Sequence, residues 1–93
     1  MKRFPSPFGQ VELTDERLQH ILEFHPEIKK FQKLFLKVLA DPKFIRRSKF
    51  DSKAYILYRP IASNKHLAIV IKTNKRNFIL TAYLTNKFQH SQP

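Results

Sequence analysis

The sequence predicts an α+β domain in which two N-terminal helices pack on a three- to four-stranded antiparallel β-sheet. Its 93 residues, 42% of them hydrophobic, suffice for one core and leave no room for a second domain. Apolar residues recur with the helical period over residues 14–39, and runs rich in Ile, Val, Tyr, Phe and Thr follow over residues 54–85. The connections between these runs are too short for a parallel crossover, which favours antiparallel pairing.

The N-terminal part is expected to begin irregularly and then to form two helices. Residues 1–9 hold two prolines and the chain's one glycine, which predicts an irregular lead-in, and "QVEL" after them is a candidate short strand. Thr14 is placed to cap the first helix, and Pro26 to end it. A second helix is predicted from Glu27 to about Leu39, closed by Asp-Pro.

The strands are expected in the second half of the chain. The runs "KFIRRSKF", "AYILYRPI", "HLAIVIKT" and "NFILTAYLT" are the candidates, the first of them weak, and residues 86–93 form a frayed tail. Side chains alternate between the two faces of a strand. This alternation assigns to the helix-covered face an apolar set: Leu67, Ile69, Ile71, Phe78, Leu80, Ala82 and Leu84. It assigns a mixed set to the other face: Val70, Lys72, Ile79, Thr81, Tyr83 and Thr85.

The charge is strongly uneven along the chain. The net charge is +11, from 18 basic and 7 acidic residues. Residues 1–42 hold seven basic and six acidic side chains, whereas residues 43–93 hold eleven basic ones and a single acid, Asp51. A half-domain this positive attracts polyanions, of which nucleic-acid phosphates are the commonest. A sheet face with Lys, Thr and Tyr would suit such a ligand, although an ordinary solvent-facing sheet would have the same pattern.

Several classes of protein do not fit the sequence. Without cysteine there is neither a disulfide framework nor a thiolate metal site, which suits the reducing cytoplasm expected for this protein. The first ten residues lack the apolar segment of a signal peptide, and no run is long enough for a membrane span. His20 and His25 do not have the spacing of a helical zinc pair, and the strands lack the carboxylates of a two-metal nuclease. No metal and no cofactor are therefore expected.

The remaining polar chemistry suits RNA if the protein is an enzyme. RNA has an internal nucleophile, the 2′-hydroxyl, so its cleavage needs a base, an acid and cations but no metal. His25 falls on the helical stripe of leucines and is interpreted as a half-buried packing or capping residue. His20 lies off that stripe near Arg17 and Phe24. It is either an ordinary surface histidine or lines a cleft between helix and sheet together with these two residues.

The blocks "GQVELTDERLQHILEFHPEI", "DPKFIRRS", "YILYRP", "LAIVIK" and "ILTAYLT" together resemble a known family. They are similar to small phage- and bacteria-associated nuclease-like domains of the barnase–colicin D–RelE fold group (PBECR-type), over roughly Gly9 to Thr85. The resemblance implies N-terminal helices on a four-stranded antiparallel sheet. It also implies metal-independent endoribonuclease activity, often as a toxin that an antitoxin or immunity protein neutralises.

The resemblance also implies a set of functional residues. His20 matches the helix histidine taken as catalytic, and Lys72, Thr81 and Tyr83 match polar positions on the sheet. The expected nucleic-acid-binding residues are Arg17, Arg46, Arg47, Tyr58 and Arg59.

Three hypotheses follow for the function. The first is an RNA-cleaving domain that uses His20 as acid or base. The second is a non-catalytic nucleic-acid-binding module that uses the same basic face. The third is an antitoxin-like protein whose positive half docks on an acidic protein.

Overall fold

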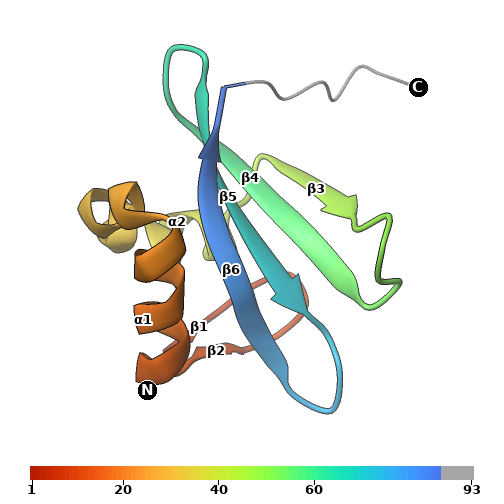
Figure 1. Ribbon diagram of the computed structural model, residues 1–93. Coiled ribbons are helices and arrows are strands. Elements are labelled where there is room, and N and C mark those ends of the chain that lie inside the picture. The colour runs from red at the N-terminus through yellow and green to blue at the C-terminus, as the bar shows by residue number, and fades with distance from the viewer. Residues whose placement is uncertain (87–93) are drawn as a thin grey trace.

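A computed structural model describes residues 1–86 as a curved six-stranded sheet with its helices on one side and at one edge (Figure 1). The α+β class predicted from the sequence is confirmed. The predicted sheet of three or four antiparallel strands is wrong, because the sheet has six strands in the order β1-β2-β6-β5-β4-β3 and is mixed. The predicted tail lies, apart from Asn86, outside the described residues.

Four of the six strands lie in the second half of the chain, as predicted. Their bounds are β3 Phe44–Arg47, β4 Ala54–Ala62, β5 Lys65–Lys72 and β6 Asn77–Thr85. They pair antiparallel in the order of the sequence. The short turns between β4, β5 and β6 enforce this arrangement, because a hairpin needs only a few residues.

The two additional strands come from the N-terminus. Strand β1, Lys2–Phe4, lies within the segment predicted to be irregular and pairs antiparallel with β2, Val11–Leu13. Strand β2 pairs in parallel with the start of β6. The chain between β2 and β6 makes up most of the domain. The prediction of antiparallel pairing considered only the short connections between strands that follow each other in sequence, so it could not detect this parallel pair. Asn77 fixes the junction, since its side-chain amide donates to the carbonyl oxygen of Phe8 at 2.8 Å.

The helical region is divided at Pro26. Helix α1, Asp15–Phe24, begins at Thr14, whose hydroxyl accepts a hydrogen bond from the backbone N–H of Arg17 at 3.1 Å. A 3₁₀ helix, η1, spans Pro26–Leu34, and α2 spans Phe35–Ala40. The second helix predicted from the apolar spacing therefore exists in the right place, but its first two-thirds are wound as 3₁₀.

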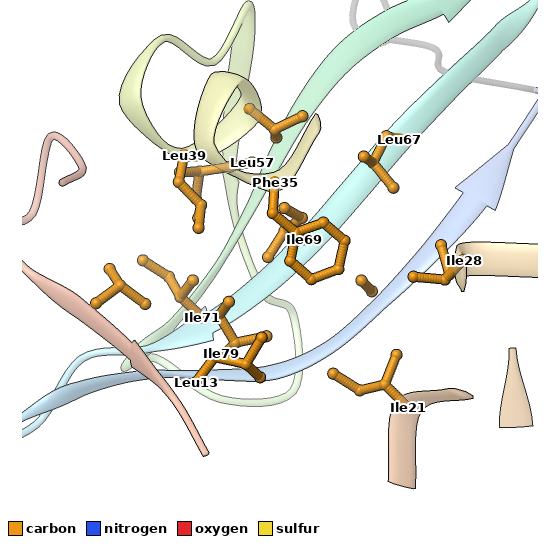
Figure 2. Packing of buried hydrophobic residues seen from close by; sticks show 13 residues of the cluster. Leu13, Ile21, Ile28, Phe35, Leu39, Leu57, Leu67, Ile69, Ile71 and Ile79 are labelled. Carbon is orange, nitrogen blue, oxygen red and sulfur yellow. The ribbon is translucent and has the colours of Figure 1, made fainter. Parts of the chain in front are cut away.

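The core lies between the helices and one face of the sheet (Figure 2). Helices and sheet contribute together to a cluster in which every side chain is at most 3% exposed. The cluster consists of Val11, Leu13, Ile21, Ile28, Phe35, Val38, Leu39, Leu57, Leu67, Ile69, Ile71, Ile79 and Ala82. The face of β5 predicted to be covered, which carries Leu67, Ile69 and Ile71, is thus confirmed.

A register shift in β6 alters the predicted faces of that strand. Ile71 pairs with Ile79, but Val70 pairs with Thr81, so Leu80 is an extra residue between the two pairs. Ile79 is consequently in the core, and Phe78 lies on the opposite face, contrary to the simple alternation. Beyond the shift Thr81 and Tyr83 lie on the face away from the core, as predicted; this surface is called the open face below.

Candidate active site

Helix α1 stands beside β6 (Figure 1). Its sequence places three polar or aromatic residues along one side of the helix. Arg17, His20 and Phe24 are spaced by three and four residues, which places them on one face of the helix. Ile21 faces the core instead and is 1% exposed. The rings of His20 and Phe24 lie with centroids 4.8 Å apart, and Phe24 is 68% exposed. The packing of Ile21 in the core therefore determines the direction in which Arg17, His20 and Phe24 face.

His25 reaches the sheet because the helix ends before it. Its backbone has left the helical region, with φ −136° and ψ 69°, while its N–H still donates to the carbonyl oxygen of Ile21 at 2.7 Å. Its ring centroid lies 6.2 Å from that of Tyr83 on β6. The Glu27 carboxylate stands 3.6 Å from Nδ1 of His25, which is longer than a hydrogen bond.

Two tyrosines meet on the open face above a small residue. Tyr58 and Tyr83 are both paired with Ala68, one from each side, so their Cα atoms are about 10 Å apart across three strands. The Ala68 methyl group leaves room between them for the two phenol side chains. Burial raises the pKa of Tyr83 to about 12, to which Tyr58 adds through its charge and a hydrogen bond, while Arg46 opposes the shift. Tyr83 is therefore a hydrogen-bond donor at neutral pH.

The next row of the sheet places a basic and a hydroxyl side chain beside the tyrosines. Arg46 pairs with Ile56, Ile56 with Val70, and Val70 with Thr81, so all four share the open face. Arg46 on β3 and Thr81 on β6 are thus at opposite ends of one row across the sheet. The open face consequently has a guanidinium at one side of the tyrosine pair and a hydroxyl at the other.

Helix and sheet enclose a cleft of about 370 Å3. Its lining combines four residues of the α1 segment with two of β6: Arg17, His20, Phe24, His25, Leu80 and Thr81. No carboxylate is among these lining residues. Within residues 1–86 the Arg17 guanidinium has no carboxylate partner, although the side chain is only partly exposed. The cleft therefore offers two imidazoles and a cation to an anionic ligand.

Six of the predicted site residues gather at this cleft and on the open face beside it. They are Arg17, His20, Arg46, Tyr58, Thr81 and Tyr83. Tyr58 is only 6% exposed, so it has little surface with which to contact a ligand. Its role is to hydrogen-bond to Tyr83.

Three predicted residues lie elsewhere. Lys72 is on the open face but four residues along β5 from Ala68, about 13 Å away, and its Nζ is 2.7 Å from a carboxylate oxygen of Asp51. That contact lowers the pKa of Asp51, with a backbone hydrogen bond from Lys53 as a further cause. Lys72 is thus paired with Asp51, which is the one acid of residues 43–93.

Arg47 and Arg59 lie on the opposite side of the sheet from Arg46 and Tyr58. Arg59 donates to the backbone oxygen of Asp41 at 2.7 Å and to its carboxylate at 3.3 Å, which ties the end of α2 to β4. Arg47 stacks on and donates to Tyr55. The register that decides the face of each arginine could not be read from the sequence, and it places these two residues apart from the cleft.

The sequence interpretation missed His25 as a site residue. It was grouped with the leucines by extending the helical period to residue 25, whereas the helix ends at Phe24. Pro26 was expected to end this helix, and the helix does end before it, because a residue that precedes proline tends to leave the helical conformation. The same rule takes His25 off the leucine stripe. The cap position of His25 agrees with its predicted capping role.

Removal of the Tyr83 hydroxyl is expected to change the alkaline stability of the protein. The folded-state pKa of about 12 exceeds the ordinary value of 10.0, so between these pH values the folded state holds the proton more tightly than the unfolded state. This contribution to the free energy of unfolding is complete below pH 10 and is lost as the pH rises through 12. Urea unfolding at pH 9 and pH 11.5 should show a smaller loss for Tyr83→Phe than for the wild type; equal losses would contradict the assignment.

Two features of residues 1–86 bear on the class of site. Within residues 1–86 no three His, Cys, Asp or Glu side chains are grouped so that they could hold a metal ion. Among the helices of the same range, none has the length and apolar character needed to cross a lipid bilayer.

Comparison with protein-family models, with curated proteins and with solved structures gives no match for this chain. The function is therefore argued from the geometry of the cleft and the open face.

Proposed function

We propose that the protein is a metal-independent endoribonuclease whose cleft between α1 and β6 holds the scissile phosphate. The observation that carries this proposal is the meeting of two imidazoles, a guanidinium and a hydroxyl in one cleft. No carboxylate is among its described lining residues, and the guanidinium has no carboxylate partner within residues 1–86. Imidazole is the side chain best suited to accept and donate protons near neutral pH. The resemblance of the sequence to nuclease-like domains supports the same proposal, with an antitoxin or immunity protein as a second partner besides RNA.

The proposed reaction is an internal transesterification. One imidazole of the His20–His25 pair accepts the proton of the ribose 2′-hydroxyl, and the 2′-oxygen forms a bond to phosphorus. The other imidazole donates a proton to the 5′-oxygen as its bond to phosphorus breaks. The products are a 2′,3′-cyclic phosphate and a 5′-hydroxyl. Arg17 stabilises the negative charge of the phosphorane, and Tyr83 and Thr81 supply neutral donors.

The charge of the second half of the chain supports a polyanionic substrate. Residues 43–93 hold eleven basic side chains and one acid, and Lys72 already neutralises that acid. The remaining basic residues raise the local concentration of RNA and its rate of association. We place this activity in the cytoplasm, where a cysteine-free chain would be at no disadvantage.

Incubation of total RNA with the purified protein in EDTA tests this function. The wild type is expected to fragment the RNA, and His20→Ala is expected to lose this activity while it still binds RNA. Salt-sensitive binding without cleavage by the wild type would contradict the enzyme and favour the non-catalytic nucleic-acid-binding module. A protein that neither cleaves nor binds RNA would contradict both.

A further inference from the structure

A second cleft, of about 500 Å3, opens between the β5–β6 turn and the start of α1. It is lined by turn residues, by β6 and by the β2–α1 junction: Glu12, Thr14, Arg17, Asn74, Lys75, Arg76, Phe78 and Ile79. Three of the lining side chains are cationic and one is a carboxylate. The proposed reaction uses only Arg17 from this set, so the rest of the cleft has no part in the chemistry described above.

This turn cleft is continuous with the candidate active site through the side chains of α1. Arg17 lines the turn cleft, the active-site cleft and a third hollow between them. Thr14 is shared by the turn cleft and that hollow, and His20 by the hollow and the active site. A chain that occupied the active site could therefore continue along α1 to the β5–β6 turn.

The cations of the turn cleft are available to a phosphate group. Arg76 is 77% exposed and stands 3.8 Å from Glu12, a pair that contributes little because both solvent and salt screen it. Glu12 also stands 3.7 Å from Arg3. Arg3 therefore still offsets the charge of the Glu12 carboxylate when Arg76 binds a ligand instead. Lys75 is exposed and has no carboxylate partner within residues 1–86.

Phe78 gives this cleft an aromatic surface. The register shift at Leu80 places Phe78 on the open face, where it pairs with Lys72 and Glu12 rather than packing under the helices. Its ring is only partly exposed, which fixes it in place. Aromatic side chains that accompany a basic groove are the usual stacking surfaces for unpaired bases. Phe78 lies about 10 Å along β6 from Thr81, a separation that suits a neighbouring nucleotide.

We propose that the turn cleft is a second nucleotide subsite for single-stranded RNA. Phe78 stacks on a base, and Lys75 and Arg76 bind the phosphate that joins this nucleotide to the one in the active-site cleft. This inference rests on the proposed function in so far as the ligand is RNA, and it adds that the substrate is an unpaired strand read over more than one nucleotide.

Equilibrium binding of fluorescein-labelled oligouridylates of two to six nucleotides tests the subsite. All proteins carry His20→Ala so that cleavage does not interfere. The test variant adds Lys75→Ala and Arg76→Ala, both at exposed turn positions. The matched control adds Lys33→Ala and Lys37→Ala, which remove the same charge from exposed positions on η1 and α2. Thermal unfolding of each variant checks that the fold is intact.

The test variant should lose the gain in affinity that each added nucleotide gives, and the control should keep it. Loss of both cations from this one phosphate should also reduce the slope of log Kd against log salt by about 0.7. Equal binding by the test variant and the control at every length would overturn the subsite. Wild-type protein that shows the expected binding but leaves RNA uncleaved would instead contradict the ribonuclease and leave the subsite standing.

Discussion

Replacement of His25 with asparagine is expected to lower the rate of RNA cleavage by about 100- to 10,000-fold, the usual range for loss of a general acid or base. Asparagine can keep the backbone conformation at the end of α1 and can donate hydrogen bonds, but it cannot exchange a proton near neutral pH. His25 lines the cleft with His20, and its Nδ1 stands 3.6 Å from the Glu27 carboxylate. Single-turnover cleavage of an RNA oligonucleotide measures the effect.

The matched control for this variant is Gln19→Ala. Gln19 is exposed on the same helix and does not line the cleft, so its replacement should leave the cleavage rate unchanged. The free energy of unfolding of His25→Asn should stay close to that of the wild type. A His25→Asn protein that cleaves within about threefold of the wild-type rate would show that His25 only caps the helix, and the two-imidazole mechanism would then fail.

Replacement of Arg17 with alanine should reduce kcat/KM by about 100- to 1,000-fold, as does the loss of one group that stabilises a developing oxyanion. The same change should leave the fold at least as stable. Arg17 is in the first turn of α1, where a cation opposes the helix dipole by about 0.3 to 1 kcal/mol, and it has no carboxylate partner within residues 1–86 to offset this cost. A loss of activity with a gain in stability is characteristic of a functional residue.

Steady-state kinetics and urea unfolding measure these two quantities on the same protein. Arg17→Lys serves as the conservative variant, since it keeps the charge but not the two-pronged geometry of the guanidinium, and should recover part of the activity. If Arg17→Ala cleaved RNA normally, or if it unfolded far more easily than the wild type, Arg17 would have a structural role and the phosphorane would need another cation.

The sequence predicted those parts of the fold that depend on local pattern. The faces of β5 follow from strict alternation, and its Leu67, Ile69 and Ile71 are fully buried. The same argument failed in β6, because the extra residue at Leu80 reverses the alternation and no special residue type marks it. Pairing of β2 with β6 depends on residues more than sixty positions apart in the chain, which local spacing cannot reveal.

The candidate site was predictable where helix geometry alone decided it. Arg17, His20 and Phe24 share a side of α1, as their spacing indicated. Placement of the arginines on the sheet needed the register between strands, which the sequence does not specify, and Arg59 consequently turned out to tie α2 to β4. Lys72 could not be recognised as neutralised, because its partner Asp51 is in the loop between β3 and β4, and only the folded chain brings the two together.

The most direct test of the central claim is cleavage of one RNA oligonucleotide in EDTA, compared with the same oligonucleotide in which every ribose is 2′-deoxy. We expect the RNA to be cut to products with 2′,3′-cyclic phosphate and 5′-hydroxyl ends, while the deoxy strand stays intact. Cleavage of both strands, or RNA products with 5′-phosphate ends, would contradict a reaction through the 2′-hydroxyl and with it the roles assigned to His20 and His25.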